Sequence, residues 1–591
     1  MTKYRTRRGG TLRSEDIGTE VQLAGWVARR RDHGGVIFID LRDASGIVQV
    51  VLNPENDPAS PETLRSLRSE YCIMVSGVVR EREPGKSNPD MVTGDVEVGV
   101  SDLEVLSAAA TLPFQIDERF DADEGRRLQY RYLDLRRQKM AANLVARSTA
   151  IRAMRHVLDE RDFLEVETPT LVVSTPEGAR DMLVPSRLRP GHFYALPQSP
   201  QLFKQLLMVA GVERYYQIAR CYRDEDFRAD RQVEFTQLDL EGSFWDQDDV
   251  LETLEAIVAR VVADVRGVEI PRPIPRLTWD EAIARYGTDK PDTRFGMEIV
   301  DLGTVFAGSE FRAFAGALAE RGAVRGINAG DRGLSRAGLD KLVSDAQDLG
   351  AKGLIWMVVE DDGSLRSPVA KFLSDTELAD LATALEAKPG DVLLIVADSV
   401  KVVSHVLGQL RLQLGRPDRH DTLDFLFVVD FPVFDKTPEG NLVPAHHPFT
   451  APRSVEEMRT SPETAISRSY DMVLNGAELG SGSVRIHDPE VQSQVFDTLG
   501  ITPDEAEARF GWFLRALRFG TPPHAGFAIG VDRLVSILQN EQNIREVMPF
   551  PKTQTGADPL TGAPSRVEPT QLDELGIDIR PEVRAAWVEG S

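Results

Sequence analysis

The chain has 591 residues, which is too long for one ordinary hydrophobic core and predicts three or four domains. Its first residues carry charges with no apolar run behind them, and no stretch of about 18 apolar residues follows. We therefore expect no secretory signal and no membrane span, and we place the protein in the cytoplasm. Only two cysteines are present, Cys72 and Cys221, which excludes a disulfide framework or a zinc cluster and fits a reducing compartment.

The formal charge is −24, from 69 basic and 93 acidic residues, which taken globally argues against a nucleic-acid partner. Binding depends on the local field, however, and residues 1–31 hold eight Lys and Arg against three acids. This basic island is explained equally well by a nucleic-acid contact and by a solvated tail.

Residues 20–106 contain five short β-rich runs broken by Gly, Asp, Asn and Pro. Five strands in under 100 residues predict a small barrel of the oligonucleotide-binding (OB) type. We assign residues 1–106 to this barrel, and residues 107–137, which are polar and contain Pro113, to a hinge.

The rest of the chain predicts a multidomain α+β protein. Residues 138–161 form a helix, because Leu144, Ile151, Met154 and Leu158 recur on one stripe. Strands and helices then mix without a βαβ rhythm. The predicted division is a first catalytic part at 138–289, an α+β insertion at 290–420, a second catalytic part at 421–553 and a C-terminal extension at 554–591.

A heavily charged loop, residues 223–232, separates two strand-like runs and predicts an antiparallel hairpin. Pleat alternation gives the second strand a polar face (Gln237, Asp239, Glu241) and an apolar face (Leu238, Leu240). A polar face inside an enzyme core is costly unless it binds something polar. A solvated hairpin is the alternative, and the charges of the loop alone favour it.

Ser199 as N-cap and Pro200 at the first helical position predict the start of a helix. Gln201 and Lys204 then point from one face of its first turn. A lysine and an amide near the positive end of a helix suit a carboxylate ligand, although most such lysines are solvated.

Asn475-Gly476 between apolar runs is a strong signal for a two-residue hairpin turn. In that register Asp471 lies diagonal to Glu478, about 7 Å away on the same face. Two carboxylates at that separation can share Mg²⁺ with substrate phosphates. Simple alternation puts Arg485 on the opposite face, and a bulge within residues 480–482 could re-aim it.

Residues 526–534 read as a small-residue strand that runs into a helix with Arg533 in its first turn. An arginine there can hold a phosphate by two hydrogen bonds, whereas the alternative is a salt bridge of Asp532 at the helix start. No Walker A loop or Rossmann fingerprint is present. If the protein uses ATP, arginines and carboxylates on a sheet must bind it.

In order along the chain, these segments resemble a class II aminoacyl-tRNA synthetase, with FLEVETPTL similar to motif 1, RDEDFRADRQ to motif 2 and GFAIGVDRL to motif 3. The strings TPEGARDMLVPSR, QSPQLFKQLLM, HHPFT and GSGSVRIHD are similar to the bacterial aspartyl-tRNA synthetase family. The resemblance covers essentially the whole chain, and residues 290–420 resemble the insertion domain of that family.

The resemblance implies roles at the matching positions. Arg223 would grip the α-phosphate of ATP and Arg533 the γ-phosphate, and these are the two catalytic residues. Glu225 and Gln232 would hold the adenine end, with Phe235 stacked on the base. The implied ATP set is Arg223, Asp224, Glu225, Gln232, Phe235, Glu478, Gly530, Val531, Asp532 and Arg533, and the implied Mg²⁺ ligands are Asp471 and Glu478.

The resemblance also implies two further sets of contacts. The aspartate pocket would comprise Glu177, Ser199, Gln201, Lys204, Arg223, Asp239, His446, Gly482 and Arg485. In the barrel, Phe38 would stack on an anticodon base, with Arg31, His33, Gln49, Arg82, Gly85 and Glu97 nearby. The 138–161 helix and the Pro169 segment resemble the class II dimer element, so a homodimer is expected.

The expected activity is attachment of L-aspartate to tRNA(Asp). The aspartate carboxylate attacks the ATP α-phosphate in line, and the terminal ribose of tRNA then attacks the adenylate. Catalysis is mostly positioning and charge neutralisation by Mg²⁺ and arginine, and we assign no general base.

His33 and Gly85 resemble family members that charge tRNA(Asn) as well as tRNA(Asp), whereas members restricted to tRNA(Asp) often carry Leu at the His33 position. Charging of both tRNAs with aspartate implies a partner amidotransferase that acts on Asp-tRNA(Asn). One alternative is that His33 is an ordinary polar loop residue and the enzyme charges tRNA(Asp) alone. The other is that the chain is a related lysyl- or asparaginyl-tRNA synthetase. Lys204 and Arg485 speak against a cationic substrate, and against a neutral one if both are buried.

Overall fold

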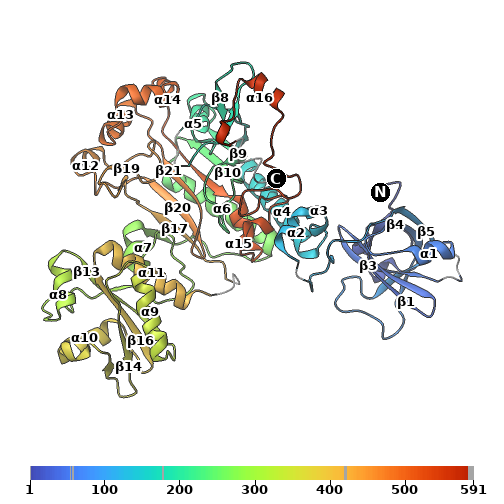
Figure 1. The fold of residues 1–591 in the computed structure, drawn as a ribbon, viewed down its shortest axis with the longest axis horizontal. Helices are drawn as coiled ribbons and strands as arrows, with labels where there is room; N and C mark the ends of the chain where they lie inside the picture. The colour runs from blue at the N-terminus through green and yellow to red at the C-terminus, as the bar shows by residue number, and fades with distance from the viewer. Residues whose placement is uncertain are drawn as a thin grey trace. The chain divides into compact units, whose positions relative to one another are not determined.

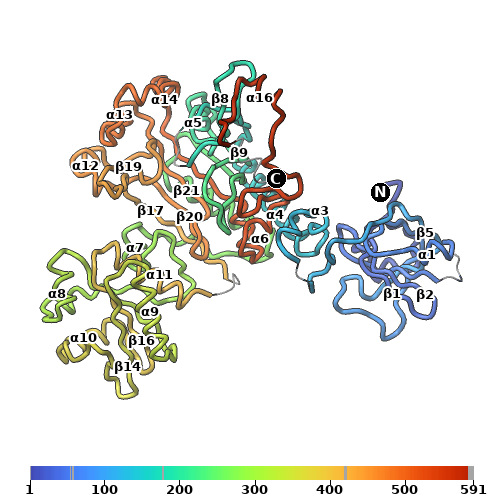
Figure 2. The backbone as a smooth tube through the Cα atoms, viewed as in Figure 1, coloured from blue at the N-terminus to red at the C-terminus, as the bar shows by residue number. Residues whose placement is uncertain are grey.

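The computed structural model describes residues 2–53, 55, 59–120, 122–175, 179–417 and 422–583. It divides into two compact units, which Figures 1 and 2 show coloured along the chain. The first comprises Met1–Ala142 with Asp558–Gly562, and the second comprises Asn143–Ala557 with Ala563–Ser591.

The first unit contains the barrel predicted from the sequence. Its strands are β1 (Glu20–His33), β2 (Val36–Asp43), β3 (Gly46–Leu52), β4 (Cys72–Glu81) and β5 (Val96–Ser107), which close in the order β1-β2-β3-β5-β4. Ile37, Ile39 and Leu41 of β2 point into the core, because alternate residues of a strand face opposite sides. Helix α1 (Pro61–Ser66) lies between β3 and β4 in the chain, and the predicted hinge contains α2 (Glu124–Gln129) and α3 (Arg131–Asp134).

The second unit is built on an eight-stranded sheet, which confirms the predicted antiparallel catalytic sheet. Neighbouring strands from β17 to β9 are antiparallel, and only the two edge pairs are parallel. The order is β11 (Arg276–Thr278), β17 (Phe425–Val429), β20 (Ser469–Leu474), β21 (Ala477–Val484), β22 (His524–Gly530), β10 (Glu234–Ser243), β9 (Arg214–Tyr222) and β6 (Leu164–Glu165).

One face of this sheet carries the main hydrophobic core. Helices α4 (Gln138–Asp159), α6 (Gln247–Arg266) and α15 (Val531–Leu538) contribute buried side chains to it together with β10, β20 and β22. The predicted apolar stripe of α4 is confirmed at Met154 and Leu158, which are fully buried. The opposite face is left for polar side chains.

Residues 290–420 contain the predicted α+β insertion. Its five-stranded sheet runs β12 (Val300–Asp301), β13 (Ala323–Asp331), β16 (Asp391–Asp398), β14 (Ile355–Val359) and β15 (Leu365–Arg366). Two hydrophobic clusters use alternate residues of β13 and β16, so each face of the sheet has its own core. The helices are α8 (Arg312–Ala319), α9 (Arg336–Asp348), α10 (Asp375–Ala384) and α11 (Val400–Gly415).

Smaller elements complete the second unit. They are α5 (Gln201–Val209), α7 (Trp279–Tyr286), the pairs β7 (Leu183–Pro185) with β8 (Phe193–Ala195) and β18 (Phe434–Lys436) with β19 (Leu442–Pro444), and helices α12 (Val455–Thr460), α13 (Pro489–Thr498), α14 (Pro503–Leu517) and α16 (Pro569–Leu575). Across the described ranges, no helix is long and apolar enough to cross a membrane.

Candidate active site

A pocket of about 480 Å³ opens on the polar face of the eight-stranded sheet. Its walls come mainly from five segments that are far apart in the sequence: the start of α5, the β9–β10 hairpin, residues 446–450, strand β21 and the β22–α15 junction. Each of the five contains at least one residue that the sequence or the resemblance predicted at the site. The sheet therefore brings the predicted site residues together.

One end of the pocket presents buried nitrogen donors. The Arg223 guanidinium lies over the Phe235 ring at 5.0 Å, and its Nε is buried without a hydrogen-bond partner among the described residues. Gln232 is 2% exposed, and its Oε1 accepts from the backbone N–H of Lys552 at 3.0 Å. Its Nε2 has no partner in the described part of the chain. Buried donors normally have acceptors, so this end suits a ligand rich in oxygen or aromatic nitrogen.

The other predicted nucleotide residues lie around this end. Arg533 donates to the backbone oxygen of Glu478 and, at 3.2 Å, to Asp230. The carboxylate of Asp532 accepts from Arg147 and from the backbone N–H of Thr236, so the predicted helix-start salt bridge is present. Glu225 is paired with Arg231 at 3.1 Å, whereas Asp224 is exposed and Gly530 and Val531 form the β22–α15 junction.

The β20–β21 hairpin has the predicted turn, with φ of 53° at Asn475 and 77° at Gly476. Val473 faces Glu478 as expected, but Met472 faces Gly480, so the chain bulges at Leu479. The bulge lies one residue before the predicted range of 480–482. It changes the alternation, so that Ser481, Ser483 and Arg485 share the pocket face with Glu478.

Asp471 and Glu478 lie close enough to influence each other. Asp471 is 6% exposed and accepts from Nε2 of His446 at 3.2 Å. Burial and the negative charge of Asp471 raise the pKa of Glu478, and the Lys290 ammonium lies 3.9 Å from its Oε2. Two carboxylates that repel each other favour a cation between them. Within the described ranges no group of three His, Cys, Asp or Glu could hold a metal alone, so the pair suits an ion that also binds substrate oxygens.

The other end of the pocket holds four buried charges. Lys204 Nζ lies 2.7 Å from Asp239 and 3.1 Å from Glu241, and Arg485 donates to Glu241 at 2.9 and 3.2 Å. All four side chains are 5% exposed or less. Lys204 and Arg485 are both buried, as the argument against a neutral substrate requires, but burial alone does not exclude such a substrate. Both cations are paired with carboxylates of the protein itself, so the four groups sum to zero charge.

The ion pairs shift the pKa values of this end of the pocket. Burial would raise the pKa of Glu241, but Arg485 and Lys204 hold it at about 2. Burial, with Arg485 and Lys204 nearby, lowers the pKa of His447 to about 3. Burial also opposes protonation of His446, yet its hydrogen bond with Asp471 and the charge of Glu478 leave its pKa raised. The pKa values of these adjacent histidines are therefore shifted in opposite directions, because His446 contacts the carboxylate of Asp471.

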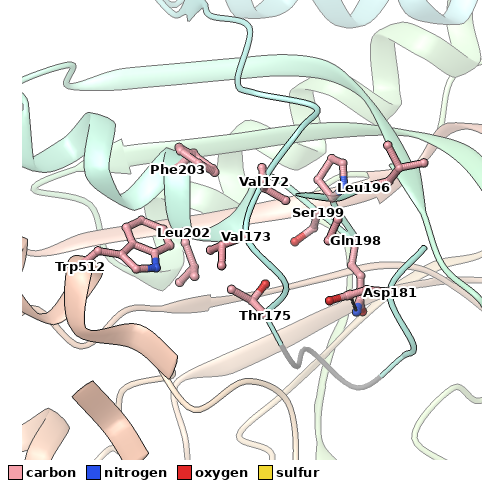
Figure 3. Close-up of a pocket in the computed structure, with 12 residues that line it drawn as sticks. Val172, Val173, Thr175, Asp181, Leu196, Gln198, Ser199, Leu202, Phe203 and Trp512 are labelled. Atoms are coloured by element: carbon pink, nitrogen blue, oxygen red, sulfur yellow. Dashed lines mark hydrogen bonds between the residues drawn. The ribbon is translucent and has the colours of Figure 1, made fainter. Parts of the chain in front are cut away.

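Two predictions about this end need correction or fall outside the structure. Helix α5 begins at Gln201 with Pro200 as its N-cap residue, so Ser199 is not the N-cap, although its Oγ accepts from the Gln201 N–H at 3.3 Å. Glu177 lies outside the described residues. Figure 3 shows Ser199 beside Gln198, Asp181 and Thr175 in a smaller adjoining crevice. Gln198 donates to Ala179 at 2.9 Å there.

Gly482 lines the pocket for a steric reason. A Cβ atom at this position would lie 2.2 Å from the backbone oxygen of Gly526 and 2.8 Å from the Tyr470 ring. Only glycine fits where two strands and an aromatic ring approach so closely.

The comparisons with known proteins agree with this geometry. A family model described as tRNA synthetases class II (D, K and N) matches residues 123–554, and an OB-fold nucleic acid binding domain matches residues 21–106. A protein of Salinispora arenicola (strain CNS-205), named aspartate–tRNA(Asp/Asn) ligase, is 52% identical over 99% of this chain and 98% of its own. The chain belongs to the class II tRNA synthetases.

Other members of the family give the same picture. A protein of Thermobifida fusca (strain YX) with the same name is 51% identical over 98% of this chain and 99% of its own. The crystal structure of asparaginyl-tRNA synthetase from Pyrococcus horikoshii, complexed with asparaginyl-adenylate, is similar with a TM-score of 0.55 and 21% identity, over 94% of this chain and 98% of that one. The structural likeness confirms the fold of this synthetase.

The barrel of the synthetase carries four of its predicted residues, Arg31, Phe38, Gln49 and Glu97, on one face. Phe38 is opposite Arg31 in the β1–β2 pair, and Gln49 is opposite Glu97 in β3–β5. Arg31 donates to Gln49 at 3.2 Å, and Gln49 donates to Glu97 at 2.7 Å. The ring of His33 meets that of Phe38 edge to face, with centroids 5.8 Å apart. Arg82 is buried and donates to the Val96 oxygen at 3.2 Å, and Gly85 has a φ of 77° with open space around its Cβ position.

Sequence analysis did not select several residues that line the pocket. They are His447, Thr450, Ser481 and Ser483. Pleat alternation placed Gln237 and Glu241 on the same polar face as Asp239, and in the structure Gln237 lines the pocket while Glu241 pairs with Lys204 and Arg485. The serines could not have been found in this way, because their orientation depends on the exact position of the bulge.

Proposed function

We propose that this synthetase attaches L-aspartate to tRNA through an aspartyl-adenylate made from ATP. One observation carries the proposal: a single pocket is lined by buried donors at one end, by Glu478 of the carboxylate pair at its side, and by the Lys204 and Arg485 cations at the other end. The family and the names of relatives about 50% identical over nearly the whole chain support the same activity.

In this proposal each residue has a positional role. Arg223 binds the α-phosphate, where charge develops when the aspartate carboxylate attacks, and Arg533 binds the γ-phosphate. Gln232 and Phe235 hold the base. Lys204 and Arg485 bind the substrate side-chain carboxylate, while Asp239 and Glu241 fix both cations in place.

Asp471 and Glu478 would hold Mg²⁺. The two carboxylates repel each other, and within the described residues they belong to no group of three side chains that could hold a metal alone. They therefore fit an ion whose remaining ligands are phosphate oxygens and water. Bound Mg²⁺ would neutralise phosphate charge. His446 keeps Asp471 oriented through its Nε2 contact.

We infer that tRNA(Asp) and tRNA(Asn) are both substrates. The outer face of the barrel combines an aromatic ring with basic and amide side chains, which fits unstacked anticodon bases. His33 lies at the exposed end of this face, and Gly85 adds no side chain. A chain that charges tRNA(Asn) with aspartate needs a partner amidotransferase, and we propose one. Cys72 and Cys221 form no disulfide in the described part of the chain, which fits a reducing cytoplasm.

A homodimer is also proposed. Within residues 145–194 a set of large apolar side chains is exposed, although monomeric proteins rarely expose many in one region. The set is Val145, Leu164, Leu171, Val173, Leu183, Leu188, Phe193 and Tyr194. It includes α4 and the segment around Pro169, where the dimer element is expected.

The activity is tested by ATP–pyrophosphate exchange with aspartate, asparagine or lysine as the amino acid. Exchange that requires aspartate, followed by formation of aspartyl-tRNA, supports the proposal. Equal exchange with asparagine or lysine would contradict it.

A further inference from the structure

The chain that follows motif 3 contacts the charged β9–β10 loop at three separate places. The Ile544 N–H donates to the Ala229 oxygen at 3.0 Å. Lys552 meets the end of the loop, and Gly556 meets the middle of it. None of residues 544–556 belongs to the nucleotide set implied by the resemblance. We call residues 544–556 the strap.

The contact at Lys552 fixes the direction of an amide. Its backbone N–H donates to Oε1 of Gln232 at 3.0 Å, and its ammonium donates to Glu234 at 3.0 Å. An amide group has one accepting end and one donating end. Because Oε1 is held by the strap, only Nε2 is left for the pocket, and this atom is buried without a partner among the described residues.

The contact at Gly556 fixes the loop itself. Gly556 has a φ of 78°, and a Cβ atom there would lie 2.9 to 3.0 Å from the Phe227 ring. The backbone closes a tight turn at this point, since Thr553 donates to the Ala557 oxygen at 2.8 Å and Gly556 donates to the Thr553 oxygen at 3.1 Å. Glycine is therefore needed both for the turn and for the close approach of the ring.

We propose that the strap is a positioning element for recognition of the nucleotide base. The Lys552 N–H orients Gln232 so that it can only donate to the ligand, which selects a purine edge that offers a ring-nitrogen acceptor. The inference rests on the proposed function, in which Gln232 holds the base end of ATP. Lys552 does not touch the nucleotide, so its effect is exerted through Gln232.

The decisive comparison is between two variants at one position. Lys552→Pro removes the backbone N–H, whereas Lys552→Met keeps it and removes only the ammonium. A neutral hydrogen bond contributes modestly. We therefore expect the KM for ATP in aspartate-dependent exchange to be about threefold to tenfold higher in Lys552→Pro than in Lys552→Met, with kcat and the KM for aspartate equal within about twofold.

Two further measurements separate orientation from folding. Gln232→Leu should raise the KM for ATP by a similar factor, and adding Lys552→Pro to it should raise the KM no further, because one interaction is lost only once. With 1-, 3- and 7-deaza-ATP as probes, one analogue should abolish the difference between the Lys552 variants. If Lys552→Pro does not fold, Gly556→Ala, which displaces Phe227, should show the same selective rise and the same dependence on the analogue.

Each outcome bears on a different claim. Equal KM values for ATP in the two Lys552 variants, or a rise that is the same with all three analogues, would overturn the role of the strap and leave the proposed function intact. A Gln232→Leu variant with a normal KM for ATP would remove Gln232 from the base site and the inference with it. Absence of aspartate-dependent exchange in the wild type would refute the proposed function itself.

Discussion

The ammonium of Lys204 lies 2.7 Å from a carboxylate oxygen of Asp239, and both side chains are 1% exposed. A buried cation paired in this way is costly to remove, because its partners are then left without a counter-charge. In Lys204→Met, Asp239 and Glu241 would share only Arg485. We expect a loss of roughly 3–5 kcal/mol in the free energy of unfolding, and loss of aspartate activation by at least about 10²-fold. Urea unfolding and pyrophosphate exchange measure the two effects.

The double variant Lys204→Met/Asp239→Asn separates stability from binding. It restores charge balance, so much of the lost stability should return while aspartate activation stays low. Recovery of activation in the double variant would show that Lys204 does not contact the substrate. Lys436→Met is a matched control, because Lys436 is half exposed and its pair with Glu463 is on the surface, where the expected change is below about 0.5 kcal/mol.

The carboxylate pair gives a second prediction. Asp471→Ala and Glu478→Ala should each abolish adenylate formation, because ATP phosphates would lose the shared Mg²⁺. Binding of tRNA measured by filter retention should stay near the wild-type level, since the barrel is unchanged. Asp435→Ala, an exposed carboxylate of β18, is the control for loss of an acidic side chain. Normal exchange in both pocket variants would remove the metal assignment.

The sequence predicts this hairpin well because its signals are local. Asn475-Gly476 requires two residues with positive φ, and the register of Val473 and Glu478 follows from the turn alone. The bulge at Leu479 is not encoded locally, since it depends on how β21 fits between β20 and β22. The prediction therefore placed it one residue too late.

The charge balance of the pocket could not be predicted for a similar reason. Sequence spacing placed Lys204 on the same helix face as Gln201, but β10, which supplies the partners of Lys204, is about 35 residues away in the chain. Whether a cation is free or paired depends on tertiary contacts. The role of Lys552 is still less visible, because it acts through its backbone N–H and any residue except proline has one.

The exposed apolar set predicts self-association. Sedimentation at micromolar concentration should show a dimer of the synthetase. Val145→Asp and Leu171→Asp, whose side chains are 63% and 51% exposed, should shift the sedimenting species toward the monomer. Phe519→Asp is the matched control, because Phe519 is 80% exposed but lies outside the set. An active wild-type monomer would contradict the proposal.

His447 predicts a loss of stability in acid. Its pKa is about 3 in the folded protein against an ordinary value of 6.5, so the unfolded chain binds the proton more readily between these values. The free energy of unfolding must then fall as the pH drops below about 6.5, and the loss between pH 7.0 and 5.5 is about 1.3 kcal/mol.

Over this interval the free energy of unfolding of His447→Gln, measured by urea unfolding, should fall by about 1 kcal/mol less than that of the wild type. The carboxylate of Glu241, with a pKa of about 2, titrates lower and contributes mainly below pH 5. His156→Gln is the control for removing a surface histidine, and equal pH slopes for wild type and His447→Gln would refute the assignment.

We propose that the barrel selects between the two tRNAs. Aspartate and asparagine anticodons differ only at the third anticodon base, so the catalytic pocket cannot distinguish them. His33 packs edge to face on Phe38, and the imidazole can donate or accept a hydrogen bond, so it can accommodate more than one base edge.

His33→Leu removes the ability to donate and to accept, and it retains a side chain that still packs on the Phe38 ring. We expect charging of purified tRNA(Asn) with aspartate to fall by about tenfold or more, the equivalent of one or two hydrogen bonds, with tRNA(Asp) charging within about twofold of wild type. Gly85→Ala is a less specific test of the same idea than His33→Leu. Gly85 has a φ of 77°, so a substitution there also strains the turn. If wild-type protein does not charge tRNA(Asn), or if His33→Leu charges it equally well, then discrimination does not depend on this loop.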